Sequence, residues 1–280
     1  MDYKTIVVHL DQGARTAGRL ETAFSLARTF DAHLVGVFAL SVAHVPGYML
    51  SEAGTPLFEA SRRYRTEAAN KAKAAFDAAA ATGERVETEW RTSEQDAIEA
   101  MCVNARYADL AIIGQRERDA ERDDGLAPEF VGEFLLSAGR PVLVVPYAGR
   151  FAQIGRRVLI AWNARQQAAR AVTDALPLLA RAEAVKVMVF DPEKGRADHG
   201  DVPGADIALC LARHGVKVSV AQQRCGNEMV GEQILSRAAD MDADLIVMGA
   251  YGHSRVRELV LGGATRTLLG SMTGPVLMSH

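Results

Sequence analysis

The chain contains the same series of segments twice, in the same order. ADLAIIGQ at 108–115 returns as ADLIVMGA at 243–250, and GRPVLVVPY is matched near the C-terminus by TGPVLMSH. TIVVHLD near the N-terminus has its counterpart in RVLIAWN in the second half. Three matches in one order indicate a tandem duplication. We therefore expect two related domains, residues 1–150 and 151–280, with the boundary in the polar, glycine-bearing segment YAGRFAQIGRR.

Each half alternates strand-like and helix-like segments. Short runs such as TIVVHL and DLIVMG have the length of buried strands, and apolar residues between them recur at helical spacing, as at Leu20, Phe24 and Ala27. Such alternation predicts parallel strands with helices on both faces of a sheet. The expected fold class is α/β, with two tandem flavodoxin-like domains, each a five-stranded parallel sheet. The first half also has room for a long Ala-rich helix over residues 56–82, preceded by a loop, SVAHVPGYMLSEAGTP.

The composition argues against several classes of function. A net charge of −3 and a pI near 6.2, without a block of Lys and Arg, give no reason to expect nucleic acid as a partner. The apolar runs are shorter than a membrane span and the N-terminus has no secretory pattern, so we expect no membrane association. Three cysteines without a CxxC spacing, Cys102, Cys210 and Cys225, argue against disulfides and structural zinc and favour a cytoplasmic location.

A glycine-rich loop follows the strand-like segment DLIVMG of the second half. Its sequence, GAYGHSRVRELVLGG, places Gly249 and Gly252 at one end and Gly262 and Gly263 at the other, where the helical segment GGATRTLL begins. The free N–H groups and the dipole of a helix N-terminus attract anions, so the loop is a candidate phosphate cradle. The alternative is that the glycines only form a turn between strand and helix. Neither GxGxxG nor GxxxxGK[ST] is present, so a dinucleotide or Walker-type site is not expected.

The pattern Gly249-x2-Gly252-x9-Gly262 resembles the nucleotide-binding signature of the universal stress protein family, and the chain resembles tandem members over its full length. The resemblance implies an adenine nucleotide alpha hydrolase-like fold that binds ATP, with or without Mg²⁺. It implies that the signature glycines hold the phosphates, that Asn163 lies at the ribose and that Ala161 and Phe190 lie beside the base. The nucleotide-binding residues implied are Ala161, Asn163, Phe190, Met248, Gly249, Gly252, Gly262, Gly263 and Ala264. It further implies pairing of the two last strands, and it allows a homodimer.

Two residues depart from the family pattern. Gly263 stands where the family has Ser or Thr, which removes a hydroxyl contact of about 0.5–1.5 kcal/mol. Asn163 stands where the family usually has Asp, and a divalent cation prefers carboxylate oxygens. Weaker nucleotide binding is therefore expected, though not its loss.

The first half lacks the glycine loop altogether. Asp11 is present at the end of its first strand, but the loop position holds the charged residues Arg116, Arg118, Glu121 and Asp124. We interpret this half as a partner domain that binds no nucleotide, or that binds something else. The apolar segment HVPGYML is interpreted as a contact surface rather than a small-molecule pocket.

Candidate catalytic groups do not form a coherent set. GHSRV at 252–256 resembles a nucleophile elbow, but Val256 replaces its last glycine, so His253 and Ser254 are interpreted as loop residues. The cluster DHGD at 198–201 is interpreted as a polar turn rather than a metal site. His9 is expected to be a core or cleft histidine, and the pair Glu87 and Glu89 a solvated face.

The expected function is therefore nucleotide sensing. The C-terminal domain would bind ATP or a related nucleotide, and the protein would act as a stress-response sensor or regulator rather than a fast enzyme. Two alternatives remain: a nucleotide-independent interaction or scaffold module, and a slow ATPase. Protein partners would exist, but the sequence does not identify them.

Overall fold

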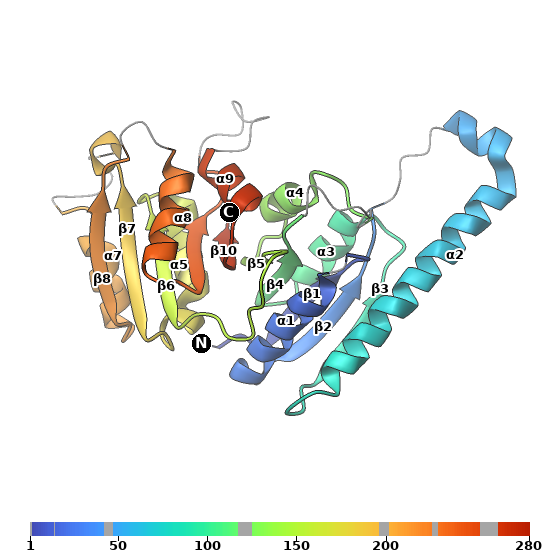
Figure 1. Ribbon diagram of the computed structural model, residues 1–280, viewed down its shortest axis with the longest axis horizontal. Coiled ribbons are helices and arrows are strands. Elements are labelled where there is room, and N and C mark those ends of the chain that lie inside the picture. Colours follow the sequence, from blue (N-terminus) through green and yellow to red (C-terminus); the bar gives the residue numbers. More distant parts are fainter. Residues whose placement is uncertain are drawn as a thin grey trace.

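The computed structural model describes residues 2–280 except 14, 42–46, 117–124, 196–201, 226–228 and 253–262; for 47–58 and 194–195 it describes only the backbone. Each half alternates strands and helices (Figure 1). The elements of the N-terminal half are β1 (Thr5–Leu10), α1 (Thr16–Phe30), β2 (His33–Phe38), α2 (Gly47–Ala80), β3 (Thr88–Thr92), α3 (Ala97–Ala105), β4 (Leu110–Gly114), α4 (Phe130–Ser137) and β5 (Val142–Val145).

The C-terminal half repeats this order, which confirms the predicted α/β class. Its elements are β6 (Arg157–Trp162), α5 (Gln166–Leu179), β7 (Ala184–Phe190), the 3₁₀ helix η1 (Pro192–Gly195), α7 (Ala205–Arg213), β8 (Val218–Gln223), α8 (Val230–Asp240), β9 (Leu245–Gly249), α9 (Gly263–Ser271) and β10 (Val276–Ser279).

All ten strands form one sheet in the order β3-β2-β1-β4-β5-β10-β9-β6-β7-β8. Pairing is parallel within each block of five strands. The two blocks meet at β5 and β10, which pair antiparallel with Leu277 opposite Leu143. The mixed sheet therefore has the same strand order in both halves, read outward from the junction.

Side chains also bridge the two halves near the junction. The hydroxyl of Tyr3 donates to the backbone carbonyl of Asp174 at 2.7 Å. Gln115 Nε2, at the end of β4, donates to the carbonyl of Leu269 in α9 at 2.9 Å. These bonds hold helices of the second half against the first.

Helices cover both faces of the sheet. Residues of the strands alternate between faces, so Ile6 and Val8 pack into one core while Val7 packs into the other. The first core includes residues of α1, α2, α5 and α7, and the second includes residues of α3, α4, α8 and α9. No helix in the described parts of the chain has the length and apolar character that a membrane span needs.

The long helix α2 begins earlier than predicted. The sequence predicts this helix over residues 56–82, with a loop before it. The structure starts α2 at Gly47, since the Met, Leu, Glu and Ala residues before Pro56 are good helix formers. The prediction of a loop over residues 41–56 is therefore wrong from Gly47 onward. In the segment HVPGYML, residues 44–46 lie outside the described part of the chain, and the helix begins at the glycine that follows them.

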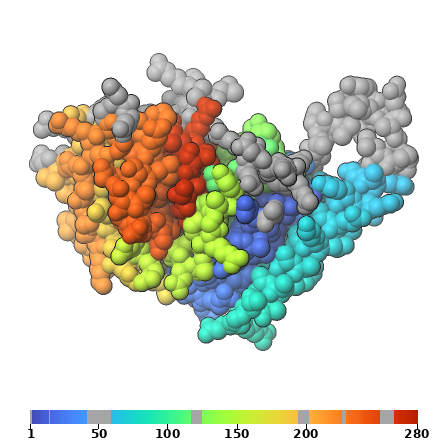
Figure 2. Space-filling view, viewed as in Figure 1, coloured from blue at the N-terminus to red at the C-terminus, as the bar shows by residue number. Residues whose placement is uncertain are grey.

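The second part of α2 packs against the sheet. Phe76 is buried beside Gly36, where an added Cβ would lie 2.7 Å from the ring, and its ring centroid is 5.4 Å from that of Phe24. Farther toward the helix start, Tyr64 is 54% exposed. α2 thus forms a ridge along one margin of the molecule (Figures 1 and 2).

Candidate functional site

Three residues meet at the carboxyl edge of the C-terminal half, between the end of β6 and the glycine loop. Asn163 follows β6, and its Oδ1 accepts a hydrogen bond from the backbone N–H of Arg165 at 3.1 Å. Arg165 Nη1 in turn donates to the carbonyl of Gly252 at 2.6 Å. Ala164 between them takes a left-handed conformation, with φ of 58°, which makes the turn tight. The guanidinium therefore connects the β6–α5 turn to the loop after β9.

The glycines of the loop differ in what surrounds them. A Cβ at Gly252 would lie 3.4 Å from Arg165 Cδ and 3.6 Å from Asn163 Nδ2, which are ordinary contacts. Gly263 begins α9, and a Cβ there would meet no atom of the described residues within 4 Å. The N-terminus of α9 is therefore open on the side of this glycine, as an anion site on a helix end requires.

Gly249 has a packing reason to be glycine. A Cβ on it would lie 2.5 Å from the backbone nitrogen of Ala168 and 2.6 Å from the carbonyl carbon of Gln167, at the start of α5. Real Cβ atoms do not approach backbone this closely, so the contact between β9 and α5 explains this glycine without a ligand. Its phosphate-binding role remains a prediction. Gly262, His253 and Ser254 lie outside the described residues.

The residues predicted beside the base lie on one face of the sheet. Ala161 of β6 pairs directly with Met248 of β9 and with Met188 of β7. Phe190 lies two residues beyond Met188 and is half-buried on the same face, as is Ala264 of α9. Met188 was not predicted as part of this face. Its place beside Ala161 depends on the register of β6 against β7, which the sequence does not show.

Hydrogen bonds hold the strand ends and α9 together. The N–H of Tyr251 donates to Thr265 Oγ1 of α9 at 3.4 Å, and the N–H of Ala250 donates to the carbonyl of Ser279 at 2.9 Å. His280 Nδ1 donates to the carbonyl of Ala250 at 3.1 Å. Arg165 is the polar residue that sequence reasoning missed here, and the available signal was a basic residue in the turn directly after β6.

The corresponding edge of the N-terminal half is filled by its own side chains. Asp11 occupies the position after β1, and its Oδ2 lies 2.8 Å from Arg19 Nη2. Its Oδ1 accepts hydrogen bonds from Thr16 Oγ1 at 2.9 Å and from the N–H of Gly13 at 2.8 Å. Asp11 is 8% exposed and Arg19 4%. Burial alone would raise the pKa of Asp11, but the charge and hydrogen bond of Arg19, with His9 and Thr16, hold that pKa below its usual value.

Arg19 occupies the space beside the end of β4. A Cβ at Gly114 would lie 2.6 Å from Arg19 Nη1. When the first residues of β1 and β6 are aligned, Ala171 of α5 is the counterpart of Arg19, and it is fully buried. The guanidinium of Arg19 thus fills the carboxyl edge of the N-terminal half, whereas the matching residue of the C-terminal half, Ala171, has only a methyl group. The predicted loop residues Arg118, Glu121 and Asp124 lie outside the described part of the chain.

His9 is a buried member of this cluster. Its Nε2 donates to the carbonyl of Ala39 at 2.9 Å, while its Nδ1, with no hydrogen-bond partner in the described structure, lies 3.9 Å from Asp11 Oδ2. Burial lowers the pKa of His9 to about 4, although Asp11 opposes the shift. His9 is therefore neutral at pH 7, with its proton on Nε2 because a carbonyl can only accept.

Metal and thiol chemistry find little support in the described residues. They contain no group of three or more His, Cys, Asp or Glu side chains able to hold a metal ion. Asp198, His199 and Asp201 lie outside them. All three cysteines are described and none forms a disulfide; burial raises the pKa of Cys102.

Residues 155–280, which contain this edge, match the sequence model of the universal stress protein family. The C-terminal half, which this model covers, belongs to the universal stress protein family. A curated universal stress protein from Synechocystis sp. (strain ATCC 27184 / PCC 6803 / Kazusa) is 46% identical over 46 residues, and the match spans 16% of this chain and 16% of that protein.

Solved structures resemble the whole chain. A universal stress protein from Archaeoglobus fulgidus DSM 4304 has a TM-score of 0.66 and 15% identity, with 98% of this chain and 97% of that chain covered. A functionally unknown protein from Pseudomonas aeruginosa PAO1 has a TM-score of 0.59 and 15% identity, with 99% and 92% covered. At these identities the similarity shows a common fold over the full length of the chain.

Proposed function

We propose that the C-terminal half binds ATP or a related nucleotide at the carboxyl edge of its strands. The observation that carries the proposal is the meeting of Asn163, Arg165 and Gly252 beside the open N-terminus of α9. The phosphates would lie on the N–H groups at Gly263 and Ala264, with the guanidinium of Arg165 beside them. The amide of Asn163 would face the ribose.

The base would lie near the face formed by Ala161, Met248 and Phe190. These side chains are apolar and lie on neighbouring strands, so they offer a flat surface for a purine ring. Asn163 supplies an amide where the family usually has a carboxylate, so Mg²⁺ would be held mainly by phosphate oxygens. With this weak hold on the metal, any hydrolysis would be slow.

At the level of the cell, the proposal is a cytoplasmic sensor or regulator of the stress response. Nucleotide occupancy of the C-terminal half would be the signal, and the closed N-terminal half would serve as a structural partner. We also propose that residues 1–150 and 151–280 are the two domains, since the strand order repeats across that point. A homodimer would need a surface other than the edges of β5 and β10, because those pair within the chain.

Calorimetric titration with ATP, with and without Mg²⁺, tests the binding. Gly252→Val places a branched side chain between Asn163 and the loop at a position where only ordinary contacts are nearby, so the variant should fold and lose binding. Arg165→Met should weaken ATP more than adenosine, because only ATP carries phosphates. Gly274→Val is the matched control: a Cβ at Gly274, before β10 at the opposite edge of the sheet, would come no closer than 3.7 Å to Ala243 O.

The outcomes separate the functions. Saturable binding at one site per chain, lost in Gly252→Val and kept in Gly274→Val, supports the proposal. No heat at millimolar ATP in the wild-type protein contradicts it. The second candidate, an interaction module without nucleotide, is favoured by the packing reason for Gly249 and by the exposed ridge of α2. It predicts that Gly252→Val keeps the partners that a pull-down recovers, whereas changes on α2 lose them.

A further inference from the structure

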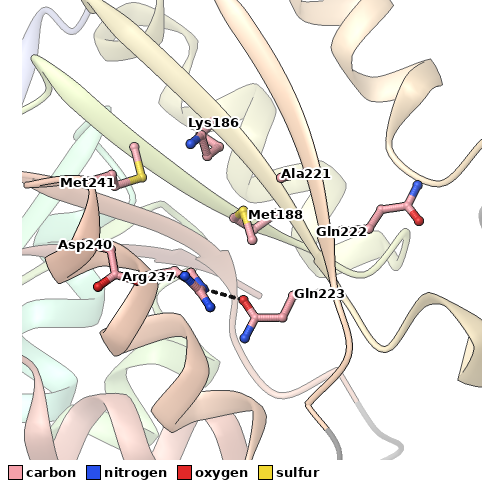
Figure 3. Close-up of a pocket in the computed structure, with 8 residues that line it drawn as sticks. All are labelled: Lys186, Met188, Ala221, Gln222, Gln223, Arg237, Asp240 and Met241. Carbon is pink, nitrogen blue, oxygen red and sulfur yellow. Dashed lines mark hydrogen bonds and ion pairs between the residues drawn. The ribbon is translucent and has the colours of Figure 1, made fainter.

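A pocket of about 310 Å³ lies on the sheet face between β7, β8 and α8 (Figure 3). Lys186 and Met188 extend from β7 into it, and Ala221 of β8 lies beside them. On the other side Arg237 and Asp240 come from α8, with Met241 directly after it. The pocket combines a floor of methionine and alanine with cationic groups above it.

Lys186 is the cation of the pocket for which the described part of the chain provides no counterion. Among the residues that the structure describes, no hydrogen bond or ion pair reaches its ammonium group, although its side chain is partly buried. The other cation is already paired: Arg237 Nη1 lies 2.8 Å from Asp240 Oδ2, and Arg237 Nε lies 2.5 Å from Gln223 Oε1. The cross-strand neighbour of Lys186 on β8 is Ser219, which carries no charge.

The N-terminal half has different side chains at the matching positions of this face. Aligning β2 with β7 by their pairing to β1 and β6 places Val35 at the position of Lys186, and Val35 is 4% exposed. The counterpart of Ala221 is Arg91, which lies beside Val37 and reaches Asn104 Oδ1 of α3 at 2.7 Å. The C-terminal half therefore has a lysine where a buried valine would pack and an alanine where an arginine would cover the face.

We infer that this pocket binds a small organic anion with an apolar body, whose carboxylate pairs with Lys186. The apolar part would lie against Met188, Ala221 and Met241, and methionine adapts readily to ligands of different shape. A partly buried ammonium without a counterion gains more from an anion than a solvated one does, because the pair forms in a lower dielectric. Asp240, the carboxylate of the pocket lining, is paired with Arg237, which leaves the ligand to supply the negative charge for Lys186.

The size of the pocket bounds the ligand. At about 30 Å³ per water-sized group, 310 Å³ holds roughly ten non-hydrogen atoms, at the lower end of ligand pockets. Octanoate has this size and the required chemistry, and 1-octanol is its neutral counterpart. The two compounds differ in the carboxylate alone, so they isolate the contribution of Lys186.

Methyl NMR of protein carrying ¹³C-methyl methionine reports on the pocket directly. Octanoate should shift the methyl signals of Met188 and Met241 saturably, with assignments from Met188→Leu and Met241→Leu. In Lys186→Met the affinity for octanoate should fall about tenfold while that for 1-octanol stays the same. Lys217→Met is the matched control, because Lys217 is an exposed lysine just before β8 and outside the pocket. It should leave both affinities unchanged.

Three results would overturn the inference. These are octanoate and 1-octanol binding equally, octanoate shifting only methionines elsewhere, and an unchanged octanoate affinity in Lys186→Met. Met188 of the pocket pairs directly with Ala161, which the proposed function places beside the nucleotide base. Competition between octanoate and ATP would therefore show that the two ligands share one site, and would overturn the inference of a separate pocket. Lys186→Arg keeps the charge and should retain most of the octanoate affinity, which separates loss of the ammonium from damage to the strand.

Discussion

At the carboxyl edge of the N-terminal half, the side chain of Arg19, paired with Asp11, occupies the space beside Gly114, whereas in the C-terminal half the backbone at the start of α5 lies against the matching Gly249. Both edges come from the same strand order, and in both a polar residue follows the first strand. The edges differ in the residue at the matching position of the next helix, Arg19 in α1 and Ala171 in α5, and in the closer approach of α5 to its strand. In a duplicated fold, the same position can therefore be packed by a buried ion pair in one copy and by backbone in the other.

The largest effect should come from breaking the buried pair. Arg19→Met leaves the carboxylate of Asp11 buried without its cation, which typically costs about 3–5 kcal/mol of unfolding free energy. Urea unfolding measures this loss. The double variant Asp11→Asn/Arg19→Met carries no buried charge and should be more stable than Arg19→Met alone. If the single change costs less than about 1 kcal/mol, the pair does not stabilise this edge.

Acid should weaken the same edge through His9. Its folded pKa of about 4 lies below its ordinary value of 6.5, so between these values the unfolded chain takes up a proton that the folded chain does not. Stability should fall as pH drops from 6.5 to 4, by about 3 kcal/mol, while the lowered pKa of Asp11 acts chiefly below this window. Unfolding at pH 7 and pH 4 checks the size of the change, and His9→Gln should make it smaller. An equal loss in both proteins would assign it to other groups.

The glycines of the C-terminal edge should differ in how much stability an alanine substitution costs, according to whether the added methyl group meets other atoms. Gly249→Ala forces a methyl group into the backbone of α5 and should cost about 1–3 kcal/mol. Gly263→Ala meets open space and should change stability by less than about 0.5 kcal/mol. Thermal unfolding compares the two. Equal costs would contradict the assignment of Gly249 to the β9–α5 contact.

The smallest effect should be a gain in nucleotide affinity. Gly263→Ser restores the hydroxyl that the family has at this position, and the open surroundings leave room for it. A hydrogen bond worth about 0.5–1.5 kcal/mol corresponds to roughly twofold to tenfold tighter ATP binding by calorimetry. Gly274→Ser serves as the control and should bind ATP as the wild type does. An unchanged affinity in Gly263→Ser would place the phosphates away from the start of α9.

Most of the fold could be predicted because its signals are local. Alternating and helical periodicities in each half predicted strands and helices in the right order, and the repeat predicted that both halves share one topology. The start of α2 was missed because the segment before Pro56 was interpreted as a loop, while its residues from Gly47 onward continue the helix.

The candidate site was predictable in part. The glycines and Asn163 are visible as a pattern, but the packing of Gly249 depends on how closely α5 approaches β9. The reach of Arg165 to Gly252 and of Arg19 to Asp11 depends on long side chains whose direction is set by distant partners. Met188 and Lys186 gain their meaning from the register of β7 against its neighbours. These are tertiary facts that no short stretch encodes.

The antiparallel pair at the centre of the sheet also has a consequence for synthesis. β5 ends at Val145, and its partner β10 begins at Val276, so about 130 residues must be made between them. At about 5–20 residues per second, the free edge of β5 waits on the order of ten seconds for its partner. During that time a strand of Val and Leu, which lies in the interior of the finished sheet, is open to other strands. A ribosome-bound chain halted before β10 is therefore the form of this protein most exposed to aggregation.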